Sequence, residues 1–307
     1  MMKVLITGAA GMLANDVISE LLNSGKKVFG EDISLIKGDR RCRLADIKEI
    51  DICNFEEMDA WVAMEKPDYV FHLAAETNVD VCEQNQEYAY RVNYIGTENC
   101  ALICLRHNVK LLYISTAAVF DGKKQTPYTE DDETSPDRAA NVYGRSKLLG
   151  EMAIARLLKK YFIVRAGWLM GGWELDKKFV YNIINQLRSG AKELRVVDDK
   201  FGSPTFTGDF AKNLLPLLAS ERYGIYNMVN KGAASRYEIA LKIVEFMGCE
   251  GKVRVFPVKS DEFILPAPRP RSEMMRNLHL ELIEMDHMPP WEESLKNYIL
   301  LNAPGHD

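Results

Sequence analysis

The first residues of the chain restrict its fold more than any other stretch. Residues 3–7 read as a buried β-strand, and an amphipathic helix with apolar positions at Val17, Ile18 and Leu21 follows. Between them lies the glycine-rich turn Gly8-Ala-Ala-Gly11-Met-Leu-Ala14. Such a turn offers a pyrophosphate its backbone N–H groups and the positive end of the helix. The stretch therefore predicts a nucleotide-binding α/β fold.

Each small residue of this turn has a separate task. Gly8 would permit the tight turn, Gly11 would let the phosphates approach, and the small Ala14 would pack the helix on the strand. Met12 and Leu13 belong to the same predicted set of cofactor contacts. The spacing G-x-x-G-x-x-A differs from the commoner G-x-G-x-x-G, so the prediction depends on the setting between strand and helix.

The alternation of strands and helices continues through the first half of the chain. Further strands are expected at 27–30, 49–52, 69–73, 110–115 and 162–166, with one long helix through 93–100. This pattern predicts an α/β fold, a Rossmann-type doubly wound parallel sheet that binds ligands beyond the carboxyl ends of its strands. We assign residues 1–166 and 204–229 to an NAD(P)-binding domain, and residues 167–203 and 230–307 to a smaller C-terminal α/β substrate-binding lobe.

The end of the second strand bears on cofactor choice. Asp32 lies about 20 residues beyond the glycine turn, where an acid can bind the adenosine ribose hydroxyls of NAD. Arg40, Arg41 and Arg43 follow it and could instead meet the 2′-phosphate of NADP, or form a solvated basic loop. The sequence leaves NADPH and NADH both open.

A tyrosine and a lysine stand four residues apart in Asn141-Val-Tyr143-Gly-Arg-Ser-Lys147. On a helix this spacing places both side chains on one face. A neighbouring cation favours the phenolate, so the pKa of Tyr143 is expected to fall from about 10 toward neutrality. Tyr143 is therefore a candidate proton donor. The alternative is an ordinary exposed pair, because this spacing is common in helices.

Composition restricts the class of partner. The chain has 307 residues, 47% of them hydrophobic, and a net charge of −5 without a basic block, which favours a small-molecule partner over nucleic acid or a membrane surface. We see neither a signal peptide nor an apolar run of membrane-spanning length. The six cysteines lack a C-x-x-C pair and the five histidines are scattered. We expect reduced thiols, a cytoplasmic protein and no catalytic metal.

Together these motifs resemble the extended short-chain dehydrogenase/reductase family. The resemblance covers residues 1–170 and includes Thr7-Gly8-x-x-Gly11, Asp51-Ile52, His72-Leu73-Ala74-Ala75, Asn93, Ser115-Thr116 and Tyr143-x-x-x-Lys147. Within that family, four segments resemble the dTDP-4-dehydrorhamnose reductases: Thr77-Asn-Val79-Asp80, Arg165-x-x-Trp168, Phe201-Gly-Ser-Pro204-Thr205 and Arg269-Pro270-Arg-Ser272. That resemblance implies an NADPH- or NADH-dependent oxidoreductase that reduces the C4 ketone of a nucleotide-linked 6-deoxyhexose.

The resemblance also implies residue roles. Thr116 would bind the keto oxygen, Tyr143 would donate the proton, and Lys147 would hold the nicotinamide ribose. The implied cofactor contacts are Gly8, Gly11, Met12, Leu13, Asp32, Asp51, Ile52, Leu73, Ala74, Ala75, Asn93, Ser115, Tyr143 and Lys147. The implied substrate contacts are Thr77, Val79, Thr116, Trp168 and Arg269. Core packing is the alternative for Trp168, and a homodimer is an open alternative to a monomer.

One departure from the resemblance follows the catalytic threonine. The reductases usually have Asp-Tyr there, whereas this chain has Ala117-Ala118. We infer that a polar substrate contact is missing, which leaves the identity of the sugar open. Alanines cannot perform acid–base chemistry, so a 4,6-dehydratase is rejected. An epimerase with tightly held NAD⁺ and a non-catalytic regulatory subunit, like the methionine adenosyltransferase β subunit, remain as alternatives.

Overall fold

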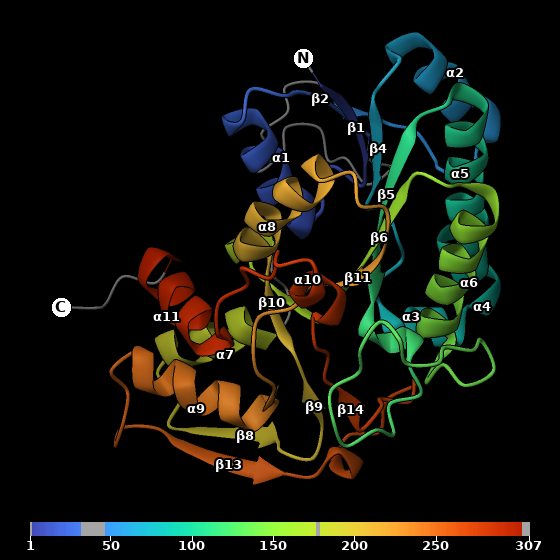
Figure 1. Ribbon diagram of the computed structural model, residues 1–307. Helices are drawn as coiled ribbons and strands as arrows, with labels where there is room; N and C mark the ends of the chain where they lie inside the picture. Colours follow the sequence, from blue (N-terminus) through green and yellow to red (C-terminus); the bar gives the residue numbers. More distant parts are fainter. Residues whose placement is uncertain (1, 32–46, 176–178, 303–307) are drawn as a thin grey trace.

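A seven-stranded parallel sheet forms the centre of the computed structural model, which describes residues 2–31, 47–175 and 179–302 (Figure 1). The strand order is β11-β6-β5-β4-β1-β2-β3, which confirms the predicted doubly wound, Rossmann-type fold. The strands are β1 (Lys3–Thr7), β2 (Lys27–Glu31), β3 (Ile47–Lys48), β4 (Tyr69–His72), β5 (Lys110–Thr116), β6 (Tyr161–Ala166) and β11 (Gly224–Asn227).

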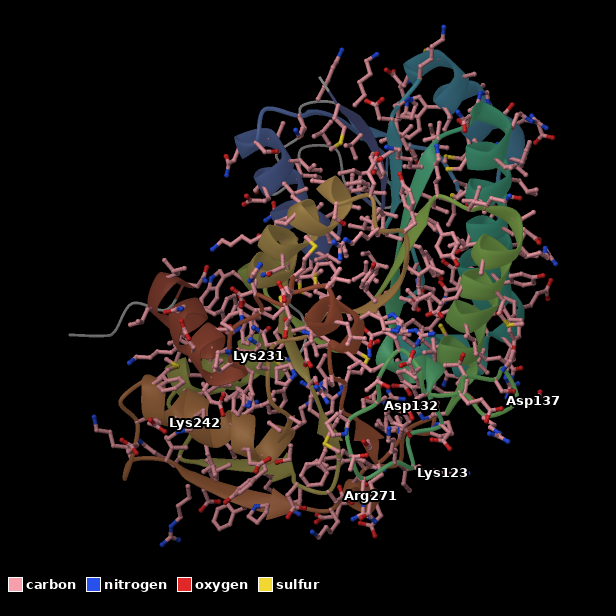
Figure 2. The ribbon with its side chains drawn as sticks, viewed as in Figure 1. Lys123, Asp132, Asp137, Lys231, Lys242 and Arg271 are labelled. Atoms are coloured by element: carbon pink, nitrogen blue, oxygen red, sulfur yellow. The ribbon has the colours of Figure 1, made fainter. Side chains whose placement is uncertain are left out.

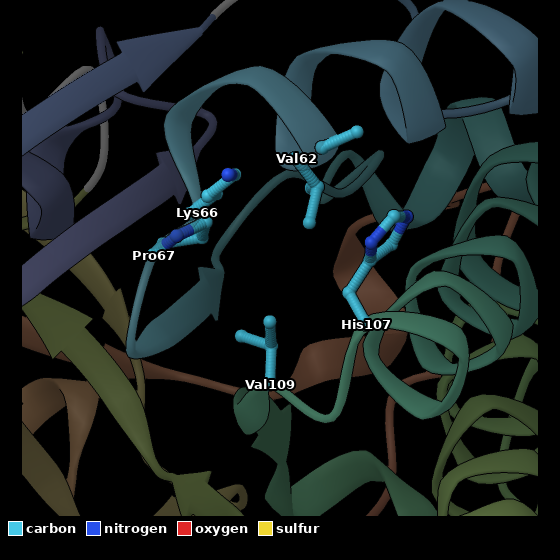
Figure 3. A pocket seen from close by; sticks show the side chains of 6 residues that line it. Val62, Lys66, Pro67, His107 and Val109 are labelled. Carbon is cyan, nitrogen blue, oxygen red and sulfur yellow. The ribbon is translucent and has the colours of Figure 1, made fainter.

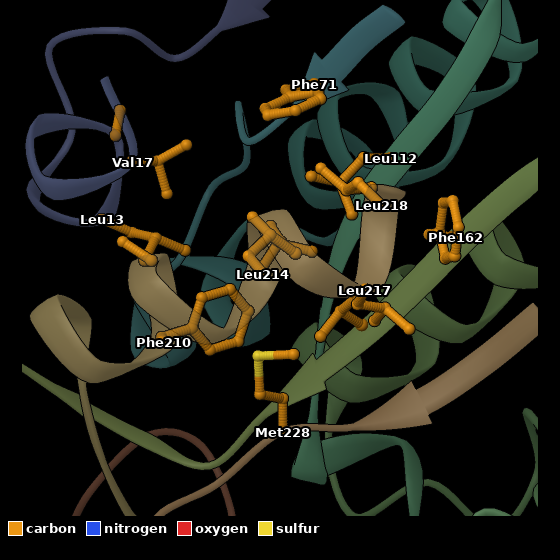
Figure 4. Close-up of a cluster of buried hydrophobic side chains, with 14 of the residues drawn as sticks. Leu13, Val17, Phe71, Leu112, Phe162, Phe210, Leu214, Leu217, Leu218 and Met228 are labelled. Atoms are coloured by element: carbon orange, nitrogen blue, oxygen red, sulfur yellow. The ribbon is translucent and has the colours of Figure 1, made fainter. Parts of the chain in front are cut away.

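Helices cover both faces of this sheet (Figure 1). One face is covered by α1 (Met12–Asn23) and α8 (Thr207–Ala219), and the other by α2 (Phe55–Glu65), α5 (Gly96–His107) and α6 (Val142–Leu157). Under α1 and α8, the side chains of Phe71, Leu112 and Phe162 are fully buried against Phe210 and Leu214 (Figure 4). Because both faces are buried, the central strands are continuous apolar runs.

The strand predicted at 49–52 is wrong. Pairing with β2 ends at Lys48, and residues 52–53 form a turn. Asp51 explains the change, because its Oδ1 accepts a hydrogen bond from the N–H of Cys53 (2.9 Å) and its carbonyl oxygen accepts one from Asn54 (2.8 Å). An Asp side chain that bonds the backbone two residues on favours a turn over an extended strand.

The single long helix predicted after β4 is interrupted. The structure has α3 (Val79–Gln84), α4 (Gln86–Tyr90) and a π-helical turn (Arg91–Ile95) that leads into α5. Two asparagines begin the first two pieces, since Asn78 Oδ1 accepts the N–H of Asp80 (3.1 Å) and Asn85 Oδ1 accepts that of Tyr88 (3.1 Å). The π-turn contains the predicted site residue Asn93.

A smaller group of elements lies beside the carboxyl half of the sheet (Figure 1). Its larger elements are α7 (Phe179–Arg188), β8 (Glu193–Val197), α9 (Arg236–Phe246), β13 (Arg254–Val258) and α11 (Trp291–Asn302). Its short elements are β7 (Trp168–Met170), β9 (Phe201–Gly202), β10 (Pro204–Phe206), β12 (Ala234–Ser235) and β14 (Ser272–Glu273). Helix α10 (Leu278–Leu282) packs instead on β11, with Leu280 in the core of the central sheet. Val180, Ile184, Ile239 and Leu295 belong to an apolar core of its own. We call it the second lobe; the predicted domain boundaries stay predictions.

The loop between β5 and α6 crosses to this second lobe. The N–H of Tyr128 donates to the carbonyl of Met274 (2.7 Å), and the N–H of Arg276 donates to the carbonyl of Tyr128 (2.8 Å). In Figure 2, Lys123 of the loop and Arg271 of the second lobe lie near one another at the lower edge of the molecule. The loop therefore ties the end of the sheet to the second lobe.

A surface depression of about 330 Å³ lies at the opposite edge of the sheet (Figure 3). Pro67 and Val109, which line it, precede β4 and β5, so it adjoins the amino ends of these strands. Ligands of doubly wound sheets bind at the carboxyl ends. The depression is therefore not the candidate site. None of the described helices is long and apolar enough to cross a membrane.

Candidate active site

The glycine turn after β1 contacts the chain that leaves β4. Gly8 has a φ of +70°, and its carbonyl accepts the N–H of Gly11 (3.0 Å). A Cβ at Gly8 would lie 2.7 Å from the nitrogen of Ala74 and 3.0 Å from the carbonyl carbon of Leu73. Both the conformation and the space therefore require glycine. The structure brings these predicted cofactor residues together at the carboxyl edge of the sheet.

The start of α1 has room for an anion. Gly11 supplies no side-chain cap, and the first helical turn has no acidic residue. Uncapped N–H groups at a helix start favour a phosphate. The side chain of Met12 reaches the second lobe, since a Cβ at Gly172 would lie 2.5 Å from its Cγ. Leu13 is buried in the core under α1.

Three other predicted cofactor residues have protein partners or are buried. Asp51 Oδ2 pairs with Arg91 Nη2 (3.0 Å). Ile52 is buried, and it fills the space that a side chain at Gly96 would need. Ser115 is buried, and its Oγ has no hydrogen-bond partner among the described residues. Their cofactor roles stay predictions.

The residues expected to set cofactor choice are not among those that the structure describes. Asp32, Arg40, Arg41 and Arg43 lie outside the described residues, so the choice between NADPH and NADH is not decided by them. In the part of the chain that is described, no three His, Cys, Asp or Glu side chains gather as metal ligands would. The expectation of no catalytic metal stays a prediction.

Asn93 joins the loop after β4 to helix α6. Its Oδ1 accepts the N–H of Glu76 (2.8 Å), and its Nδ2 donates to the carbonyl of Glu76 (3.0 Å) and to Ser146 Oγ (3.1 Å). Ser146 Oγ in turn donates to the carbonyl of Tyr143 (2.9 Å). Both ends of the buried amide are engaged, so Asn93 positions the half-buried Ala75–Glu76 segment against α6. A π-turn at such a position is typical of functional sites.

Helix α6 carries Tyr143 in its first turn and Lys147 one turn later. Lys147 is buried, and its Nζ lies 4.0 Å from the centroid of the Tyr113 ring, a cation–π contact. Burial lowers the pKa of Lys147 to about 7, although the charge of Glu151 opposes that shift. Tyr113 also stacks on His72, whose ring bonds Thr7 and Thr97. The Tyr113 ring, itself held by His72, therefore fixes the position of Lys147.

The pKa of Tyr143 moves opposite to the expected direction. Removal from water raises the pKa of the phenol well above its usual value, and the charges of Glu273 and Glu76 add to that rise. The nearby Thr116 side chain acts in the opposite direction and lowers the pKa of the phenol. The direction differs from the expected fall because burial is the largest cause of the shift. At neutral pH the phenol keeps its proton, as a proton donor must.

Ala117 and Ala118 lie beneath the start of α6. Both side chains are buried, and a Cβ at Gly144 would come within 1.9 Å of the carbonyl oxygen of Ala118. Close packing of this turn against α6 places Thr116 beside Tyr143. The two alanines contribute packing here, and the loss of a polar substrate contact from this turn stays a prediction.

The predicted substrate residues come from both lobes. Thr77 is exposed, and the half-buried Val79 begins α3. One residue later, Asp80 Oδ2 pairs with Arg269 Nη2 (2.8 Å), and Asp80 Oδ1 accepts the N–H of Ala267 (3.1 Å). Arg269 is therefore held on α3, and the segment 265–271 of the second lobe is held with it.

Trp168 lies on the second-lobe side of the site. Its Nε1 donates to Glu273 Oε2 (2.8 Å), and the guanidinium of Arg236 lies 3.9 Å from its ring centroid. A Cβ at Gly202 would come within 2.3 Å of the indole, so this glycine makes room for the ring. The ring is only half-buried, and it packs against the apolar core of the second lobe, so a substrate role for Trp168 stays a prediction. The sequence did not point to Glu273, because a single glutamate in a two-residue strand forms no motif and no hydrophobic periodicity.

Residues 2–302 match the RmlD substrate binding domain family. The chain belongs to this family. The spore coat polysaccharide biosynthesis protein SpsK of Bacillus subtilis is 35% identical over 300 residues, with 97% of both chains covered. A crystal structure of a dTDP-4-dehydrorhamnose reductase from Clostridium acetobutylicum superposes with a TM-score of 0.87 at 36% identity, covering 98% of this chain and 99% of that one.

A second solved relative bears on the cofactor. The dTDP-4-dehydrorhamnose reductase of Bacillus anthracis, solved in complex with NADP, is 33% identical and has a TM-score of 0.87, with 98% of this chain and 100% of that chain covered. These likenesses confirm the predicted resemblance over the whole chain, including the second lobe. The individual site residues of this RmlD-family protein stay predictions.

Asn141 connects the two lobes of the RmlD-family site. Its Oδ1 caps α6 by accepting the N–H of Gly144 (2.9 Å), and its Nδ2 donates to the carbonyl of Pro268 (3.1 Å). An asparagine before a helix is a readable N-cap signal, but its partner 127 residues away is not. One side chain thus fixes both the start of α6 and the segment 265–271.

The two bonds of Asn141 can be separated by substitution. Asn141→Asp keeps the cap acceptor but loses the donor to Pro268, so we expect near-unchanged stability and faster tryptic cleavage after the exposed Arg271. Asn141→Ala loses both bonds and should lower the free energy of unfolding by about 1 kcal/mol. Urea titration and timed proteolysis measure the two effects. Equal cleavage of Asn141→Asp and wild type would contradict this account.

Proposed function

We propose that this protein is an NADPH- or NADH-dependent reductase of the C4 ketone of a nucleotide-activated 6-deoxyhexose, namely a dTDP-4-dehydrorhamnose reductase. One observation carries the proposal: helix α6 places Tyr143 at the carboxyl edge of the sheet, close enough to Thr116 for that side chain to act on the pKa of the phenol, with Lys147 one helical turn further on. The named reductases that match over nearly the whole chain support the same reading.

The residues present fit a bound nicotinamide dinucleotide. Gly8 and Gly11 leave the turn open for close approach, and the uncapped start of α1 suits a pyrophosphate. When bound, the reduced nicotinamide supplies the hydride. The NADP complex of the Bacillus anthracis relative supports NADPH as the first cofactor to test.

Side chains of the protein would supply the proton that the keto oxygen takes up. Thr116 and Tyr143 would both hydrogen-bond the keto oxygen, and Tyr143 would transfer its proton as negative charge develops there. The high pKa of the phenol keeps that proton in place until the carbonyl oxygen becomes basic. Lys147 would hold the nicotinamide ribose and, in its charged form, stabilise the phenolate that remains.

The sugar would lie between the two lobes. Thr77 and Val79 approach it from the loop after β4, and Trp168 and Arg269 approach it from the second lobe. A half-buried indole presents an apolar face that suits a deoxy sugar. These contacts are part of the proposal.

The test uses purified protein and dTDP-4-dehydro-L-rhamnose, generated in situ by the upstream enzymes. Cofactor absorbance is followed with NADPH and NADH in parallel, with a control that lacks the keto sugar. We expect oxidation that depends on the keto sugar, faster with the preferred cofactor. Absence of oxidation by a protein that binds NADPH would reject this substrate, and interconversion of sugars without net oxidation would instead indicate an epimerase.

A further inference from the structure

Glu273 is an acidic side chain of the second lobe that binds the indole of Trp168. Its backbone is fixed, because β14 runs parallel to β9 and the N–H of Ser203 donates to its carbonyl (3.4 Å). Its charge contributes to the raised pKa of Tyr143, so the carboxylate and the phenol lie within electrostatic reach. The residue comes from outside the Tyr143-x-x-x-Lys147 and Ser115-Thr116 motifs.

Only one of its two carboxylate oxygens is occupied. Oε2 accepts the Trp168 Nε1–H, whereas Oε1 accepts no hydrogen bond from any residue in the ranges 2–31, 47–175 and 179–302. No ion pair to Glu273 forms within these ranges either: Arg269 pairs with Asp80, and Lys200 donates to the carbonyl of Arg269. The charge of Arg236, which lies over the Trp168 ring, also acts on the carboxylate. Glu273 Oε1 is not among the buried atoms without a partner, so it is open to solvent and free to accept a hydrogen bond from a ligand.

The chemistry of this oxygen selects its ligand. An ionised carboxylate only accepts hydrogen bonds, so it would repel a diphosphate and gains nothing from a keto oxygen. A hydroxyl is the donor that a sugar offers beside its carbonyl. Since the contact from Ala117-Ala118 is missing, a polar contact from the opposite lobe would take its place.

We propose that Glu273 is a substrate-binding residue that accepts a hydrogen bond from a hydroxyl of the keto sugar through Oε1, while Oε2 orients Trp168. This assignment rests on the proposed function and adds a specificity-determining residue to it. It predicts a preference for sugars that carry a hydroxyl near the reacting carbon.

The test compares Glu273→Gln with wild type in calorimetric binding of dTDP and of dTDP-L-rhamnose. The amide oxygen can still accept from Trp168, but the charge is lost and the second position becomes a donor. We expect dTDP-L-rhamnose to bind about 10- to 100-fold more weakly, in line with a hydrogen bond to a charged group, and dTDP to bind unchanged within about twofold. Wild-type affinity of the variant for dTDP-L-rhamnose would overturn the proposal.

Trp168→Phe separates direct contact from an effect through the indole. It removes the N–H donor but keeps an aromatic ring and Glu273. If Glu273 acted only by holding Trp168, Glu273→Gln would bind like wild type, and Trp168→Phe would be as defective as Glu273→Ala. We expect the reverse order, with Trp168→Phe the milder variant. If wild type binds dTDP-L-rhamnose no better than dTDP, the proposed function fails, and the assignment of Glu273 with it.

Discussion

Replacement of Tyr143 by phenylalanine is expected to lower the turnover number for the keto sugar by about 10²- to 10⁴-fold, the usual contribution of a positioned proton donor. The phenol is held by α6 beside Thr116 and keeps its proton at neutral pH, so no other described group takes its place at the keto oxygen. The ring itself remains, and with it the packing against Cys82 and Val142. Steady-state kinetics at saturating NADPH measures the loss, and a fluorescence titration should show unchanged NADPH binding.

A matched control is Tyr69→Phe. Tyr69 is buried, whereas Tyr143 is partly buried; it lies on β4 near the amino edge of the sheet, and its hydroxyl donates a 3.5 Å hydrogen bond to the carbonyl of Leu218. This variant should retain wild-type turnover. Equal turnover of Tyr143→Phe and Tyr69→Phe would remove the phenol from the mechanism.

Loss of the carboxylate of Glu151 is expected to have the largest effect on stability. Arg165 Nε and Nη2 bind its two oxygens at 3.0 and 2.7 Å, and both side chains are only 3% exposed. Glu151→Ala would leave a buried guanidinium without its partner, which costs about 3–5 kcal/mol. Urea denaturation measures this change in the free energy of unfolding.

The control for this prediction is the double variant Glu151→Leu with Arg165→Met. Replacement of a buried pair by apolar residues of similar size is often neutral or stabilising, so most of the lost stability should return. A double variant as unstable as Glu151→Ala would contradict the unpaired cation as the source of the cost. Glu151 also opposes the fall in the pKa of Lys147, so its loss should lower that pKa further.

Most of the central sheet could be predicted because its information is local. Buried parallel strands are short apolar runs, and the turn at Gly8 requires a glycine conformation that the sequence displays. The wrong strand at residues 49–52 also has a local cause. Ile50 and Ile52 are buried, as in a strand, but Asp51 bonds the backbone of Cys53 and turns the chain. Burial alone does not distinguish a strand from a packed turn.

The positions of several predicted site residues could be anticipated from the sequence, but the pKa shifts at these residues could not. The spacing of Tyr143 and Lys147 indicated a shared helix, yet the direction of the pKa shift depends on burial by elements distant in sequence. Asn141 bonds Pro268, which is 127 residues away in the sequence, and Glu273 bonds Trp168, which is 105 residues away. Such contacts exist only once both lobes are folded, and a single sequence carries no sign of them.

The strand order also sets the earliest point at which this chain can complete its core. β11 pairs with the sheet only through β6, and α8 covers Leu112 and Phe162. Both elements follow residue 203, after the first part of the second lobe has been synthesised. Until then a nascent chain has an open strand edge beside an uncovered apolar face, the combination that leads to misassociation. Productive folding therefore depends on synthesis of the second lobe.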